Sequence, residues 1–344
     1  MSTQLFAQQN NLTASLDSII QIEANSNNFS GSVIIVENDK IIFSKSVGFA
    51  NYESQIKNQL DTKSNIASVG KLFTKVVILQ LIEEGKLKLT DPVSNFYPCF
   101  DSEPSNKITI ADLLYHRSGL RDVYVSKGYI KLVKDDDPDF QEKVVKIISE
   151  EKLSFTPGTK SQYSNSGYYL LGAIASKIEG KSFKEVVTEN IFKPLNMSNS
   201  GFARTGDTIK GHAVPHKMKK GTPIEIETNL IGDRPSGAGG EYSTVSDLAK
   251  IYLSIMNDTL LLSSNSKRLL FNFNNSEPDA WTHIKTSGKI VGFVGGDTRG
   301  WSAKIGFYLL KGNNYGVIIC ANFDNMAHEL DLKLRSQIIN VEKK

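Results

Sequence analysis

The stretch NIASVGKLFTKVVILQLIEEGK, residues 65–86, raises the question on which the fold and the function of this chain depend. The stretch predicts a helix about 17 residues long that ends at Gly85. From Phe73 onward, apolar residues lie on almost every side of this helix. A helix of this kind is normally buried on most sides. It needs neither Ser68 nor Lys71 to stay folded, so these residues are either a solvated helix start or the reactive end of an enzyme.

Ser68 and Lys71 form a Ser-x-x-Lys pattern at the start of this helix. A step of three residues places both side chains on one face, and the serine lies near the positive end of the helix dipole. A neutral serine is a weak nucleophile that needs a nearby base, and a lysine in an apolar pocket can take part in proton transfer. The alternative is a serine cap with a lysine that points to water. The same spacing recurs, without a long buried helix after it, at Ser54 and Lys57, Ser149 and Lys152, and Ser264 and Lys267.

A second pattern lies in FTPGTKSQYSNSGYYLLG, residues 155–172, where Tyr163-Ser164-Asn165 is the only Tyr-x-Asn of the chain. It follows a Pro-Gly turn and precedes an apolar helix, which places Tyr163 on a constrained loop, where functional side chains often lie. A phenol beside an ammonium group can be partly ionised and act as a general base, and Asn165 is suited to orient the lysine or to hold a substrate carbonyl. The alternative is a tyrosine packed at a lobe boundary, with the asparagine as a helix cap.

The wider pattern indicates an α+β fold. Two β-branched runs flank a turn and predict a hairpin over residues 31–51. Helical segments alternate with turns over residues 89–281, and the chain becomes β-rich after that, before a last helical segment. The simplest packing is an antiparallel sheet flanked by helices, built from residues 12–88 and 282–344, plus an all-α lobe over 89–281. A cleft between two such lobes is a common place for an active site.

Composition narrows the function further. The chain has 344 residues, 40% of them hydrophobic, and a net charge of +3, which is ordinary for a globular protein and gives no support to nucleic-acid binding. No apolar run approaches the roughly 20 residues that span a bilayer, so no transmembrane segment is expected. Two cysteines, Cys99 and Cys320, and five histidines without metal-ligand spacing predict neither a disulfide framework nor a metal site. We therefore expect no metal and no cofactor.

Four segments together resemble the penicillin-recognising serine hydrolases, in the branch of the class C β-lactamases, D-alanyl-D-alanine carboxypeptidases and β-lactamase-like esterases. They occur in the order expected for this family and are SVGK (68–71), ITIADLLYHRSGL (108–120), PGTKSQYSNSGYYLLG (157–172) and GAGGEYSTVSDLAKIY (237–252). The resemblance implies the family's two-lobe fold, with Ser68 as nucleophile, Lys71 as its activating partner, Tyr163 as the base and Asn165 in support.

For two stretches inside these segments, a structural role is the first interpretation. His116, in YHRSGL, is expected to be a structural residue at a helix end. GAGGEYS, residues 237–243, predicts a tight glycine turn before a helix, with a place in the wall of the cleft as the second interpretation.

The third motif of the family departs from its pattern. A strand lining the cleft is expected to carry Lys-Thr-Gly or His-x-Gly, and the aligned triplet here is Phe293-Val294-Gly295. On this alignment Phe293 replaces a cation that faces the substrate, and a phenyl ring can neither carry charge nor donate a hydrogen bond. Gly295 and Gly296 let the backbone approach a substrate, and the N–H of Gly296 would form the oxyanion hole with that of Ser68. The alternative is a bulge near a sheet edge.

The same strand region contains two further cations. Arg299 and Lys304 follow the glycines, and the sequence leaves open whether either restores positive charge to the cleft from another direction.

These observations predict a serine hydrolase that forms an acyl-enzyme on an ester or an amide of a small molecule or peptide. Loss of the cation favours an esterase or a peptidase-like enzyme over an efficient β-lactamase. The alternative is a catalytically impaired penicillin-binding or sensor protein on the same scaffold.

The family and the polar start MSTQLFAQQNN, which is compatible with the remainder of a removed export signal, favour a periplasmic or secreted location. An ordinary polar N-terminus and a cytoplasmic location stay open.

Overall fold

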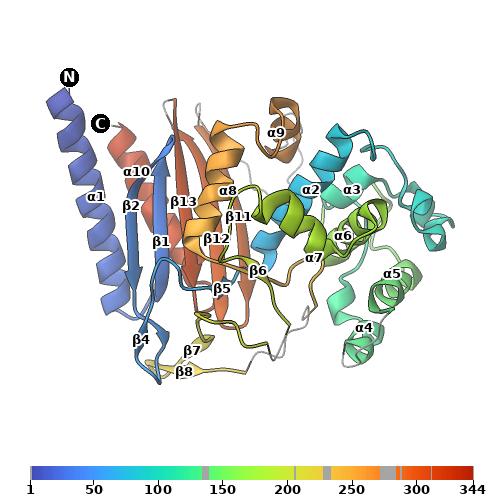
Figure 1. Ribbon diagram of the computed structural model, residues 1–344, viewed down its shortest axis with the longest axis horizontal. Coiled ribbons are helices and arrows are strands. Elements are labelled where there is room, and N and C mark those ends of the chain that lie inside the picture. The colour runs from blue at the N-terminus through green and yellow to red at the C-terminus, as the bar shows by residue number, and fades with distance from the viewer. Residues whose placement is uncertain are drawn as a thin grey trace.

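A six-stranded antiparallel sheet forms the centre of the protein (Figure 1). The computed structural model describes residues 2–133, 139–204, 207–227, 234–271, 284–286, 289–310 and 312–343. The strands follow the order β10 (Ile284–Thr286), β11 (Lys289–Thr298), β12 (Trp301–Leu310), β13 (Asn313–Ala321), β1 (Gly31–Glu37) and β2 (Lys40–Val47). The predicted hairpin is present as β1 and β2, and β1 also pairs with β13. The beginning and the end of the chain therefore build one sheet.

Helices cover both faces of this sheet. Helices α1 (Ser2–Asn25) and α10 (Met326–Lys343) pack on one face, and α2 (Lys71–Glu83) and α8 (Val245–Asn257) lie on the other (Figure 1). Strand β1 shows why both faces are apolar. Val33 and Ile35 belong to the core beneath α1 and α10, and Ile34 and Val36 belong to the core that contains α2, because successive side chains of a strand point to opposite faces. The expected antiparallel sheet flanked by helices is confirmed.

The middle of the chain is mainly helical. Its helices are α3 (Ile110–Leu114), α4 (Lys127–Leu132), α5 (Phe140–Glu150), α6 (Asn165–Glu179), α7 (Phe183–Val187) and α9 (Ser264–Phe271). Short helical turns are η1 (Ala67–Gly70), η2 (Val93–Asn95), η3 (Pro98–Phe100), η4 (Ser105–Lys107), η5 (Val123–Val125) and η6 (Thr188–Phe192).

Small sheets complete the structure, and they make the middle of the chain less purely helical than the sequence suggests. Their strands are β3 (Phe49–Asn51), β4 (Ile56–Lys57), β5 (Ser64–Asn65), β6 (Gly201–Phe202), β7 (His216–Lys219), β8 (Thr222–Glu225) and β9 (Glu241–Ser243). Strand β9 lies between β5 and β6 and so joins the start of η1 to residues of the middle segment. Such two- and three-residue strands are too short to show a sequence periodicity. The expected lobe boundary between residues 281 and 282 lies outside the described residues.

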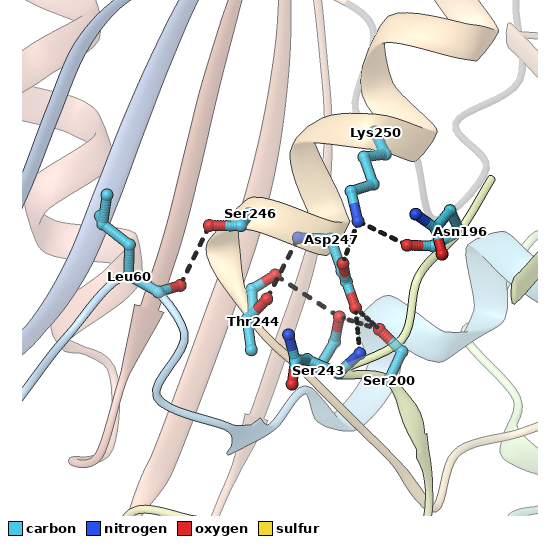
Figure 2. A network of polar contacts seen from close by, with 9 residues as sticks. Leu60, Asn196, Ser200, Ser243, Thr244, Ser246, Asp247 and Lys250 are labelled. Atoms are coloured by element: carbon cyan, nitrogen blue, oxygen red, sulfur yellow. Dashed lines mark hydrogen bonds and ion pairs between the residues drawn. The ribbon is translucent and has the colours of Figure 1, made fainter. Parts of the chain in front are cut away.

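A buried carboxylate fixes the turn from β9 into α8. Figure 2 shows Asp247 at the start of α8, and its Oδ2 accepts hydrogen bonds from the backbone N–H of Asn199 at 2.8 Å and the hydroxyl of Ser200 at 2.9 Å. Its Oδ1 pairs with Lys250 Nζ at 2.7 Å, and Thr244 Oγ1 caps the helix by accepting the N–H of Asp247. This network holds β9 in place, which matters because β9 lies directly against the turn that carries Ser68.

Within the described part of the chain, no helix combines the length and the apolar character that crossing a bilayer requires.

Candidate active site

Ser68 lies in the short turn η1, immediately before α2. The turn is held by two backbone hydrogen bonds, from Ile66 N–H to Glu241 O at 3.1 Å and from Val69 N–H to Ile66 O at 3.0 Å. Ala67 has a φ of 46°, in the left-handed region that residues other than glycine seldom occupy. Strain of this kind is frequent at functional sites, where the surroundings impose it. The long helix of the sequence analysis is therefore a tight turn that presents the serine, followed by a buried helix.

Lys71 is buried under the serine. Only 3% of its surface is exposed, and its Nζ donates to Ser68 Oγ at 3.0 Å and to the carbonyl of Ala238 at 2.6 Å. The rings of Tyr163 and Tyr168 have their centroids 5.1 and 5.7 Å from the same nitrogen. The alternative of a lysine that points to water is wrong, because the amine is enclosed by aromatic rings, a carbonyl and the serine hydroxyl.

Tyr163 makes a second side-chain contact with the hydroxyl of Ser68. Its hydroxyl lies 2.6 Å from Ser68 Oγ, and 48% of the residue remains exposed. The loop that carries it ends at Ser164, whose hydroxyl caps α6 by accepting the N–H of Gly167 at 3.1 Å. The amine of Lys71 and the phenol of Tyr163 thus both lie within hydrogen-bonding distance of the hydroxyl of Ser68.

His116 fixes the ring of Tyr163. The two rings stack with centroids 4.7 Å apart, and His116 Nδ1 accepts the backbone N–H of Ser164 at 3.0 Å. Burial, and to a smaller extent the charges of Lys75 and Lys71, lower the pKa of His116 to about 3. The imidazole is therefore neutral over the whole range in which enzymes usually work. The expectation of a structural residue agrees with this geometry, although the sequence did not reveal that it supports the tyrosine.

The depressed pKa of His116 makes the protein sensitive to acid. The unfolded chain has an ordinary histidine, which binds a proton below about pH 6.5, and the folded chain resists that proton down to about pH 3. Stability from this residue is therefore complete above pH 6.5 and falls by on the order of 1 kcal/mol per pH unit below about pH 6. Urea unfolding at several pH values between 7 and 4 should show a steeper loss for the wild type than for His116→Asn, which keeps an acceptor and tolerates the φ of 55° at this position. Parallel curves would contradict the assignment.

Asn165 has a different partner from the one expected. Its side-chain Nδ2 donates to Asp122 Oδ2 at 2.8 Å, whereas the amine of Lys71 is bound to Ser68 and Ala238. The helix cap is Ser164 and not Asn165. Asn165 is therefore a neighbour of Tyr163 that holds the η5 segment, and its orientation of the lysine is not seen in this structure.

The register of strand β11 corrects the expectation for Phe293. Phe293 lies on the α10 face of the sheet, where Lys304 Nζ is 3.9 Å from the centroid of its ring. Lys304 is itself buried and forms an ion pair with Asp331 of α10 at 2.9 Å. The ring of Phe293 covers this buried pair and does not face Ser68. Lys304 accordingly points away from the serine and supplies no charge to the cleft.

Val294 and Gly296 occupy the face of β11 that meets the serine. A Cβ on Gly296 would lie 2.6 Å from Ser68 N and 2.4 Å from Ile66 O, so only glycine fits there. A Cβ on Gly295 would meet nothing closer than 4.0 Å. The glycine required by the third motif is therefore Gly296, and the residue two positions before it is Val294, which is 5% exposed. A slip of one residue in a strand exchanges the two faces, and the alignment on Gly295 contains that error.

Glu241 is a residue of the site that sequence reasoning missed. It lies on β9 with 0% exposure, and burial raises the pKa of its carboxyl to about 8, although a backbone hydrogen bond and the charge of Lys71 act in the opposite direction. An ideal Cβ on Gly70 would lie 2.0 Å from its Oε2, so the carboxyl packs directly against the turn of the serine. GAGGEYS therefore forms the floor of the site through Ala238 O and Glu241. A charged residue inside an otherwise small and apolar motif was the available signal.

Comparison with known proteins places this geometry in context. The family model described as Beta-lactamase matches residues 17–337. Protein flp of Staphylococcus aureus (strain N315) is 28% identical over 338 residues, which covers 94% of this chain and 66% of that protein. A teichoic acid D-alanine hydrolase of Staphylococcus aureus is 30% identical over 256 residues, covering 74% of this chain and 62% of that protein. The chain thus spans just under two thirds of the length of these relatives.

Comparison with solved structures finds a similar fold. A crystal structure of a penicillin binding protein from Bacillus halodurans superposes with a TM-score of 0.78 at 26% sequence identity, covering 93% of this chain and 98% of that one.

Proposed function

The chain belongs to the Beta-lactamase family, and from this premise we propose that it is a serine hydrolase that cleaves an ester or amide through an acyl-enzyme. The observation that carries the proposal is the pair of contacts at Ser68 Oγ, 2.6 Å to the phenol of Tyr163 and 3.0 Å to the amine of Lys71. A binding protein has no need of a buried amine and a phenol on one hydroxyl, whereas a serine nucleophile requires such a base.

In the proposed reaction, Ser68 Oγ attacks the substrate carbonyl and loses its proton to Tyr163. The proton then moves to the leaving oxygen or nitrogen as the bond to that atom breaks, which leaves the acyl group on the serine. Lys71 donates to Ser68 Oγ, and its positive charge stabilises the negative charge that develops there. The oxyanion would lie between the N–H of Ser68 and a backbone N–H of β11 at Gly296 or Asp297. A water activated by the same phenol releases the acid.

The cleft face of β11 supports an ester substrate without a carboxylate near that strand. Val294 is the residue that takes the place of the family's cation, and an aliphatic side chain cannot bind a carboxylate. The relative named teichoic acid D-alanine hydrolase suggests the acyl group. We propose a D-alanyl ester, which carries an ammonium and no free carboxylate, as the substrate class. Because that relative acts on teichoic acid, we also place this enzyme at or beyond the cell envelope.

A substrate panel tests this function. The purified chain should hydrolyse p-nitrophenyl acetate and the methyl ester of D-alanine, prefer the latter to that of L-alanine, and turn over nitrocefin slowly. Intact-mass measurement after a fluorophosphonate should show one adduct, which peptide mapping places on Ser68. A stable adduct with penicillin and no turnover of any ester would instead identify a penicillin-binding or sensor protein and would refute the proposal.

The register of β11 gives a separate prediction. Val294→Lys places an ammonium on the cleft face, and we expect it to raise kcat/KM for nitrocefin, which carries a carboxylate, by about tenfold, as one added ion pair allows. Phe293→His changes the opposite face and should leave nitrocefin turnover within about twofold of the wild type. Thermal unfolding of both variants controls for loss of structure. A gain in nitrocefin turnover from Phe293→His and none from Val294→Lys would show that the third motif aligns on Gly295.

A further inference from the structure

Glu241 poses a problem that the proposed reaction does not solve. Its side chain is completely buried, and no other residue among those that the structure describes donates a hydrogen bond to its carboxyl oxygens. A buried polar group without a partner is costly, and an aliphatic residue of similar size would fill the same space without that cost. The carboxyl therefore needs an explanation other than packing.

The position of Glu241 links it to the catalytic lysine. Its Oε2 lies against Gly70, the last residue of η1 and the one before Lys71, so closely that a methyl group on Gly70 would overlap it. Its main-chain oxygen accepts the N–H of Ile66 at 3.1 Å, which fixes β9 beneath η1. The carbonyl that holds the amine of Lys71 belongs to Ala238, three residues earlier in the same segment. The carboxyl and the lysine are thus held by one short piece of chain.

The effect of ionising the Glu241 carboxyl depends on the charged and titratable groups that interact with it. Among the described residues, the interacting groups are Lys71 on α2, whose charge favours the carboxylate, and Tyr124 of η5, whose pKa is raised mainly by burial and in smaller part by Glu241. With Glu241 protonated, the charge on Lys71 acts on Ser68 and Tyr163 unopposed. With Glu241 ionised, a negative charge lies against Gly70, next to Lys71 in the chain, in a buried region where charges interact strongly.

We propose that Glu241 is a positioning residue that controls the charge balance of the site: its carboxylate offsets the positive charge that Lys71 presents to Ser68, so hydrolysis slows when Glu241 loses its proton. This inference rests on the proposed hydrolase function. The direction of the effect follows from charge, because a nearby carboxylate opposes the negative charge that develops at Ser68 Oγ as the hydroxyl loses its proton. The pKa of about 8 places the change at the alkaline edge of the physiological range.

The test is the pH dependence of kcat/KM for p-nitrophenyl acetate between pH 6 and 10, with the Ser68→Ala rate subtracted at each pH. Each profile is normalised to the same protein's rate at pH 6.5. We expect the wild type to level off or fall around pH 8, and Glu241→Gln to continue rising, with a normalised rate at pH 9.5 about fivefold to tenfold above that of the wild type. Glu225→Gln, at the exposed end of strand β8, should follow the wild-type profile.

The outcomes separate the two proposals. If the wild type shows no hydrolysis that depends on Ser68 at any pH, the proposed function fails. If hydrolysis is present but the normalised profiles of the wild type and Glu241→Gln coincide, the function stands and the role of Glu241 is refuted. Glu241→Leu provides a second variant if the glutamine variant does not fold, and the pH dependence of fluorophosphonate labelling gives an independent readout on all three proteins.

Discussion

Ser68→Ala is expected to abolish ester hydrolysis, with a loss in kcat on the order of 10⁴ or more, and to leave the fold intact. The change removes only the hydroxyl group. Its oxygen lies 3.0 Å from Lys71 Nζ and 2.6 Å from the phenol oxygen of Tyr163. Without it no acyl-enzyme forms, so fluorophosphonate labelling should vanish in the same variant. Chromogenic ester turnover and intact-mass spectrometry measure the two effects.

Ser54→Ala is the matched control for this experiment. Ser54 precedes Lys57 with the same spacing, but it lies exposed in the connection between β3 and β4 and has no buried helix behind it. Its removal should leave both turnover and labelling at wild-type levels. Residual labelling in Ser68→Ala, or equal activity in the two alanine variants, would exclude Ser68 as the nucleophile.

Tyr163→Phe is expected to lower kcat by about 10² to 10⁴, the range typical of a lost general base, with a much smaller change in KM. The variant keeps the ring, and therefore its stacking on His116 at 4.7 Å, and loses only the hydroxyl at Ser68. Steady-state kinetics on p-nitrophenyl acetate at neutral pH measure the loss. A purely structural tyrosine would instead show a loss of stability with kcat little changed.

Tyr168→Phe is the corresponding control, because the ring of Tyr168 also packs on His116 and also lies near Lys71. Its hydroxyl, however, donates to the carbonyl of Leu114 at 3.1 Å, away from the serine. This variant should lose less than about tenfold in kcat. Equal losses in the two phenylalanine variants would mean that the environment of the lysine, and not proton transfer by Tyr163, accounts for the effect.

The contact of Tyr163 with Ser68 and Lys71 was implied by the resemblance of its segment to the family, whereas the proximity of Ser68 and Lys71 could be predicted because they lie one helical turn apart. Short-range spacing fixes such positions, and the sequence displays it directly. The antiparallel sheet was predictable for the same reason, from apolar runs separated by turn residues.

The register of β11 could not be predicted with the same certainty. Two adjacent glycines allow two alignments of the third motif, and only contact with Ile66 and Ser68 shows that Gly296 is the one without room for a side chain. That contact depends on how β11 pairs with β12 and on where η1 lies, and neither is encoded in local spacing. Glu241 was missed for a related reason: its significance lies in a contact with Gly70, about 170 positions away in the chain.

The pairing of β1 with β13 has a consequence for biosynthesis. The ribosome completes Ser68, Lys71 and Tyr163 long before it reaches residues 313–321, which β1 requires as its neighbour in the sheet. Contacts between such distant segments form late, since closing so large a loop must precede any gain from them. The nascent polypeptide therefore carries Ser68, Lys71 and Tyr163 before the sheet behind them can form, and the proposed activity can arise only once residues 313–321 have been made.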